Sequence, residues 1–120
     1  MLTVYRSAKV VYEGTTIKFR RPTALAAVQI ISQVSQAHTS TSEDKYKDLF
    51  ELYINTLTEY ACEICDAEME DESGNVRKFN SIKEEKEITF FMERITTNSL
   101  AQIFKEFIEQ MNPTVEEKKS

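Results

Sequence analysis

Two cysteines three residues apart, Cys62 and Cys65, have a spacing that could hold a metal ion or form a redox pair. Zinc needs four ligands in a tetrahedron, and the chain's single histidine, His38, is the only other soft ligand. A redox pair of this spacing needs a helix N-terminus or a positive neighbour to activate the thiol. We instead expect both cysteines in the middle of a long helix. The sequence therefore predicts two ordinary thiols, with no metal and no cofactor.

Other residue types that support catalysis are present without the pattern that catalysis requires. The acidic run at residues 66–72 lacks the alternating ligands and central glycine of a calcium-binding loop. His38 lies in a Ser/Thr-rich linker at residues 38–42, with no acid or nucleophile beside it. No glycine-rich phosphate loop occurs. We predict no catalytic residues and a protein that is not an enzyme.

Basic and aromatic residues alternate in Lys18-Phe19-Arg20-Arg21, a mixture typical of single-stranded nucleic-acid sites. Five basic residues and one glutamate give residues 1–22 a charge of +4, which leaves −9 for the rest of a chain whose net charge is −5. The acidic remainder would oppose a phosphate backbone, so nucleic-acid binding is kept only as an alternative. A basic front and an acidic back instead suit head-to-tail self-association into a homo-oligomer.

The composition predicts one α+β domain that is mainly helical. The chain has 120 residues, of which 41% are hydrophobic and 29% charged, and only 2 Gly and 2 Pro, too few turn formers for many short strands. No apolar run is long enough to cross a membrane and no secretory signal is visible, so we expect a cytoplasmic protein. The domain is expected over residues 1–111, with a flexible charged tail at 112–120.

The first element expected is a β-hairpin over residues 9–19 that turns at Glu13-Gly14, because glycine supplies the positive φ of a tight turn. A two-residue turn there places the apolar residues of both strands on one face. Residues 2–6 are expected to add a third strand, and Pro22 ends the sheet. The opposed pairs would be Tyr12 with Thr15, Val10 with Ile17, Lys9 with Lys18 and Ala8 with Phe19.

About four helices should follow the hairpin, the second of them long. The first covers residues 24–36, in a stretch with no charged side chain, and its apolar side holds Leu25, Val28, Ile31 and Val34. The second runs from Glu43 to Glu68, with Ser42 as its N-cap. The third follows the breaker at residues 73–75 and a capping box at 81–84. It places Ile88, Phe91, Met92 and Ile95 on one face and Phe90 off it, although a strand is also compatible with this pattern. The fourth runs from about Asn98 to Pro113 and carries Leu100, Phe104, Phe107 and Met111.

An aromatic seam along the long helix raises the question of function. Its members are separated by alternating steps of four and three residues, the spacing of a coiled coil. They either form the core of the domain or contact a partner, and the remaining apolar helix faces exceed what one small core needs. The seam consists of Tyr46, Phe50, Tyr53, Leu57, Tyr60 and Ile64.

The order of these elements, with the short motif Ile17-Lys-Phe-Arg-Arg-Pro-Thr23, resembles the tail assembly chaperones of long-tailed, lactococcal-type bacteriophages. The resemblance covers roughly residues 8–111. It implies a non-enzymatic protein that self-associates and coats the tape measure protein until the tail tube polymerises around it. Such a chaperone would work in the cytoplasm of the infected host cell and be absent from the mature virion.

The resemblance carries no catalytic residues, so the client-binding residues are chosen by heptad position and expected exposure. We expect a groove lined by Tyr53, Leu57, Tyr60, Phe90, Phe104 and Phe107. Three other functions remain open. The chain could be a small structural tail or connector protein, a DNA-binding regulator that uses the basic hairpin, or a metal-dependent enzyme or sensor that uses Cys62 and Cys65.

Overall fold

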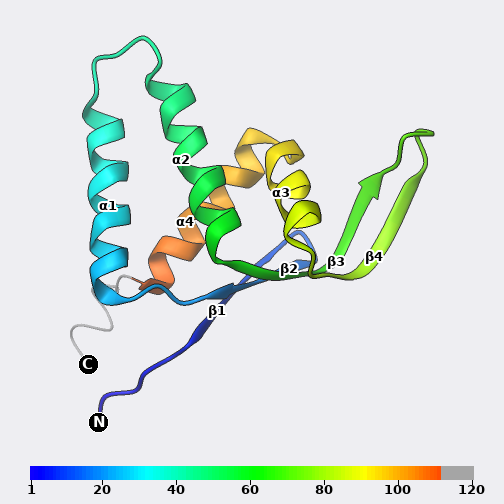
Figure 1. Cartoon of the computed structure of the whole chain (residues 1–120), viewed down its shortest axis with the longest axis horizontal. Coiled ribbons are helices and arrows are strands. Elements are labelled where there is room, and N and C mark those ends of the chain that lie inside the picture. The colour runs from blue at the N-terminus through cyan, green and yellow to red at the C-terminus, as the bar shows by residue number, and fades with distance from the viewer. Residues whose placement is uncertain (112–120) are drawn as a thin grey trace.

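The computed structural model describes residues 1–111, which form a four-stranded antiparallel sheet and four helices (Figure 1). The predicted α+β class is confirmed. The predicted charged tail lies outside the described residues. In chain order the elements are β1 (Ser7–Tyr12), β2 (Thr15–Arg20), α1 (Ala24–Thr39), α2 (Lys45–Tyr60), β3 (Ala61–Glu70), β4 (Val76–Ile82), α3 (Glu85–Arg94) and α4 (Thr97–Met111).

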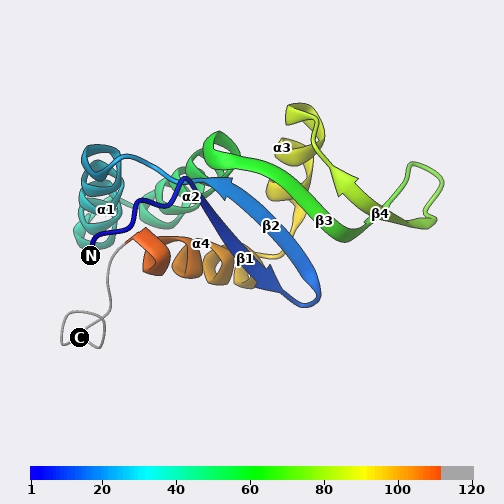
Figure 2. The same ribbon diagram turned by 90° about the horizontal axis from the view of Figure 1, so that it is seen from below.

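The strands lie in the sheet in sequence order, β1-β2-β3-β4. Helices α2 and α3 lie against one face of the sheet, and α4 runs along β1, whereas the face seen in Figure 2 carries no helix. Helix α1 packs on α2, so these two form a helical hairpin that extends away from the sheet. The β3–β4 hairpin projects at the opposite end, and we call this projecting hairpin the β arm.

The N-terminal hairpin has the predicted register, including the like-charged pair of Lys9 and Lys18. Both turn residues have positive φ, 48° at Glu13 and 83° at Gly14, as a two-residue turn between twisted strands requires. The third strand expected at residues 2–6 is not formed. Strand β3 occupies the place beside β2, and residues 1–6 extend from the sheet with exposed side chains.

The largest correction concerns the predicted helix from Glu43 to Glu68. Helix α2 ends at Tyr60, and residues 61–70 form β3, the strand between β2 and β4. Ile64 pairs with Ile17 on one side and with Ile82 on the other, and it is fully buried. Alanine, glutamate and methionine favour a helix locally, but pairing with two neighbouring strands and burial of Ile64 override that preference.

The segment before α3 was also predicted incorrectly. The expected capping box at residues 81–84 is not formed, because Ser81 belongs to β4 and pairs with Cys65. Helix α3 begins at Glu85 without a side-chain cap. The breaker at residues 73–75 is confirmed as the turn of the β arm, where Asp71 accepts hydrogen bonds from the backbone amides of Ser73 and Asn75.

Helix α1 is present, but a different face of it is buried. Ala27 and Ile30 face the core, whereas Leu25 and Val28, assigned to the apolar side, are 69% and 63% exposed. Only α2 packs against α1 to any extent, so the neighbour that would cover Leu25 is absent from the described chain. The helix after the linker begins at Lys45 with Asp44 as N-cap, instead of the predicted Ser42.

One core joins the sheet to α2, α3 and α4. Phe19 of β2 meets Phe107 of α4 with ring centroids 4.7 Å apart, and Tyr53 of α2 stacks on Phe104 at 4.3 Å. Among the three heptad-spaced tyrosines, Tyr53 and Tyr60 are buried, whereas Tyr46 is 71% exposed. The aromatic seam is therefore core over most of its length.

Candidate functional site

Five of the six residues expected to line a groove lie in the core. Phe90 is the exception, with 43% of its surface exposed on α3. The heptad position that selected these side chains marks the helix face that packs on the sheet and on α4, so five of the six do not line an open groove of the described residues. The five buried residues are Tyr53, Leu57, Tyr60, Phe104 and Phe107, each at most 9% exposed.

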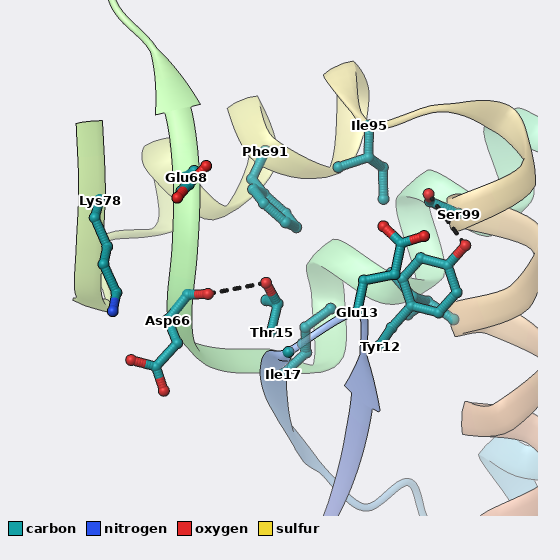
Figure 3. Close-up of a pocket in the computed structure, with 12 residues that line it drawn as sticks. Tyr12, Glu13, Thr15, Ile17, Asp66, Glu68, Lys78, Phe91, Ile95 and Ser99 are labelled. Atoms are coloured by element: carbon teal, nitrogen blue, oxygen red, sulfur yellow. Dashed lines mark hydrogen bonds between the residues drawn. The ribbon is translucent and has the colours of Figure 1, made fainter. Parts of the chain in front are cut away.

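The structure has an open cavity of about 490 Å³ where the turn between β1 and β2 meets β3, α3 and the first turns of α4 (Figure 3). Its apolar lining comes from Ile17 of β2, Phe91 and Ile95 of α3, and Ile103 of α4. In Figure 3 the side chains of Phe91 and Ile95 point toward the turn of the hairpin. The polar lining consists of Tyr12, Glu13, Thr15, Asp66, Glu68, Lys78 and Ser99.

Two hydrogen bonds hold the polar side of this cavity. The Thr15 hydroxyl donates to the backbone oxygen of Asp66 at 3.0 Å, and the Ser99 hydroxyl donates to the phenolic oxygen of Tyr12 at 3.5 Å. Asp66 has a positive φ of 58°, which turns its carbonyl toward the hairpin and directs β3 into the β arm. The position of the β arm is thus linked to the tip of the N-terminal hairpin.

A second cavity, of about 380 Å³, adjoins the first and shares Glu68, Phe91 and Ile95 with it. It lies between α3 and the β arm, and Met69 and the exposed Phe90 add to its apolar lining. We call the two adjoining cavities together the α3 groove. Phe90 is the predicted site residue that belongs to it.

The rim of the α3 groove is mainly acidic. Five acidic residues line the two cavities, against two basic ones, Lys78 and Arg94. Arg94 lies over one face of the Phe90 ring, with its guanidinium carbon 3.8 Å from the ring centroid. An apolar floor with an acidic rim favours an apolar segment that carries positive charge. The five acidic residues are Glu13, Asp66, Glu68, Glu70 and Asp71, of which Asp71 is ion-paired with Arg77 and Asp66 turns its carboxylate away from Phe91 and Ile95 in Figure 3.

The two arginines of the Ile17–Thr23 motif bind backbone carbonyls of the same chain. Arg20 donates to the backbone oxygen of Glu59 at 3.0 Å and lies over the ring of Tyr60. Arg21 donates to the backbone oxygen of Gln110. These two arginines therefore bind carbonyls in the last turns of α2 and α4, where helix dipoles favour positive charge.

The rest of the motif also has a structural role. The Thr23 hydroxyl caps α1 by accepting from the Ala26 amide at 3.2 Å. Lys18 forms an ion pair with Glu63 at 3.2 Å, and hydrogen bonding to Glu63 raises the pKa of Lys18. The basic residues that suggested a nucleic-acid site thus already have partners in the chain.

The two cysteines lie on β3 and not on a helix, contrary to the prediction. Cys62 is exposed and Cys65 is half-buried, and they are not joined by a disulfide. Cys62 is the extra residue of a β-bulge opposite Lys18 and Phe19. Within residues 1–111, no three His, Cys, Asp or Glu side chains come together as a metal site.

Sequence reasoning missed the α3 groove because it placed the surrounding residues elsewhere. Phe91 and Ile95 were recognised as apolar residues of a helix, but they were assigned to a covered face. The predicted long helix ended within the acidic run at residues 66–72, whereas this run contributes to the rim of the groove and the tip of the β arm. The available signal was the Ser-Gly-Asn breaker at 73–75, which is compatible with a second hairpin.

No helix within residues 1–111 has the length and apolar character needed to span a membrane. Comparisons of the chain with protein-family models, with curated proteins and with solved structures found no match.

Proposed function

We propose that this protein is a tail assembly chaperone of a long-tailed bacteriophage, and that it binds the tape measure protein through the α3 groove. The observation that carries the proposal is the exposed ring of Phe90 beside an apolar floor, in a groove bordered by a helix and by a projecting hairpin. The resemblance carried by residues 17–23 and by the order of the elements supports the choice of client.

The groove suits one apolar stripe of a client helix. The side chains of Met69, Phe91 and Ile95 offer contacts to apolar residues spaced three or four positions apart, as in helix-in-groove recognition. The carboxylates of the rim would attract basic residues beside that stripe. Binding in the groove would shield the apolar stripe of the client helix, which would otherwise aggregate.

Binding of this kind is weak enough to be reversed. Both cavities are open to solvent on one side, so the client would be only partly enclosed and displaceable by the polymerising tail tube. Several copies would have to bind along one long client, and self-association would bring them together before the client is bound. The chaperone would act in the cytoplasm of the infected host cell and be absent from the mature virion.

The proposal is tested by coexpression with a helical fragment of a very long, coiled-coil-rich protein encoded beside this chain. The wild-type chain should keep the fragment soluble and elute with it in size exclusion with light scattering. Phe90→Ser should lose most of this effect, whereas the control Tyr46→Ser, which removes an exposed aromatic ring outside the groove, should retain it. An aggregated fragment with the wild-type chain, or equal behaviour of the two variants, would contradict the proposal.

A further inference from the structure

Residues 1–6 form an arm whose side chains are exposed and mostly apolar. Met1, Leu2, Val4 and Tyr5 are all highly exposed, and Leu2 is almost as accessible as in an unfolded chain. The guanidinium of Arg21 lies over the Tyr5 ring, with its carbon 5.7 Å from the centroid, so the base of this N-terminal arm is attached to the body. An exposed apolar segment of this kind marks a contact with another molecule.

The N-terminal arm and the α3 groove lie at opposite ends of β1. The arm precedes Ser7, whereas the far end of β1 leads into the Glu13-Gly14 turn, which lines the groove. Six residues of strand separate them, about 20 Å. The arm also points away from the groove, so it would have to reverse its direction to reach the groove of its own chain.

The chemistry of the arm matches the groove. Leu2 and Val4 are two residues apart, so in an extended segment both side chains point the same way, about 7 Å apart. Such a pair suits two adjoining apolar cavities. Arg6 follows them and adds one positive charge, whereas the groove is lined by five acidic residues.

We propose that the N-terminal arm of one copy binds in the α3 groove of a second copy, with Leu2 and Val4 on its apolar floor. The inference rests on the proposed function in one respect, that the α3 groove is a binding surface. Because donor and acceptor differ, the contact is head-to-tail and a pair of copies keeps one free arm and one free groove, so assembly can continue. A client that enters the groove then displaces the arm, which couples client binding to the state of assembly.

Mixed cysteine variants test this contact. Cys62 and Cys65 are first replaced by serine, and a Val4→Cys chain is then mixed with a Phe90→Cys chain under mild oxidation. We expect a disulfide-linked heterodimer several-fold more abundant than with Leu25→Cys, a similarly exposed apolar position on α1, in place of Val4→Cys. A yield no greater than that of Leu25→Cys overturns the proposal. So does an intrachain disulfide in a dilute chain that carries both Val4→Cys and Phe90→Cys.

A second measurement separates this inference from the proposed function. Leu2→Ser with Val4→Ser should abolish concentration-dependent assembly in light scattering while the coexpressed client fragment stays soluble. Assembly that survives this double substitution overturns the arm contact alone. Conversely, a strong Val4–Phe90 cross-link with no solubilised fragment supports the arm contact and contradicts only the chaperone proposal.

Discussion

The side chain of Gln110 binds the backbone of Lys9 as a neighbouring β-strand would. Its Nε2 donates to the Lys9 oxygen at 2.6 Å, and its Oε1 accepts from the Lys9 amide at 3.1 Å. Strand β1 is an edge of the sheet, and edge strands with free backbone groups invite pairing with other chains. Helix α4 therefore covers one edge of the sheet with a single amide.

Replacing Gln110 by alanine should expose that edge. We expect Gln110→Ala to lower the free energy of unfolding by about 1 kcal/mol, because two hydrogen bonds are exchanged for contacts with water. It should also increase aggregation on heating. Gln102→Ala is the matched control, since Gln102 lies on the same helix and its amide contacts only Glu106, at 3.5 Å. Equal urea denaturation curves for the two variants would show that the Gln110 amide does not stabilise the β1 edge.

The two arginines at the end of β2 should contribute to stability. Arg20→Met and Arg21→Met each remove a donor to a carbonyl in the last turn of a helix, so we expect losses of about 1 to 2 kcal/mol in the free energy of unfolding. Lys105→Met, an exposed charge change on α4, should cost less than about 0.5 kcal/mol.

The same variants also test the alternative of nucleic-acid binding. Retention on heparin should fall equally for the arginine variants and for Lys105→Met, because each loses one positive charge. If Arg20→Met and Arg21→Met lost retention selectively and remained as stable as the wild-type chain, the basic hairpin would have to be regarded as a nucleic-acid site.

Truncation of the heptad-spaced tyrosines Tyr53 and Tyr46 should change the free energy of unfolding by very different amounts. Tyr53→Ala removes a buried ring that stacks on Phe104 and meets Phe50 edge-on, so we expect a loss of about 3 kcal/mol or more. Tyr46→Ala should change the free energy of unfolding by less than about 0.5 kcal/mol. Urea denaturation followed by circular dichroism measures both. A comparable cost for the two would place Tyr46 in the core as well.

Acid should weaken the contact between β2 and β3. The Ser81 hydroxyl and the Lys18 ammonium, which both bond to Glu63, hold the pKa of this carboxyl below its ordinary value of 4.5. The ionised form is therefore favoured by folding, and its contribution is present above pH 4.5 and lost as the pH falls through the lowered pKa.

The variant Glu63→Gln tests this pH dependence. Its free energy of unfolding should lie below that of the wild-type chain by a constant amount between pH 5 and 7, and this difference should shrink below pH 4.5. Glu109→Gln, an exposed change on α4, is the control. A deficit that stays the same down to pH 3 would mean that the loss comes from packing and not from charge.

Local patterns predicted the elements whose partners lie close in sequence. The N-terminal hairpin needed only a turn with two positive φ angles and apolar residues at alternate positions. Helices α3 and α4 carry apolar residues at helical spacing, and Phe90 was correctly placed off the apolar face. The groove could not be predicted, because Met69 and Phe91 come together only when the β arm packs beside α3.

By itself the sequence determined the α+β class, the register of the hairpin, and the positions of α1 and α4, and it favoured a helix at α3. Those features depend on hydrogen bonds between near neighbours and on apolar periodicity, both of which can be read in a short window. The tertiary structure alone decided that residues 61–82 pair as strands, that Arg20 and Arg21 serve helix ends, and that Tyr53 is core while Tyr46 is surface. The strand pairing depends on Ile17, Ile64 and Ile82, and the other two choices on contacts such as Arg21 with Gln110 and Tyr53 with Phe104. All of these partners are far apart along the chain, so no short window of sequence contains them.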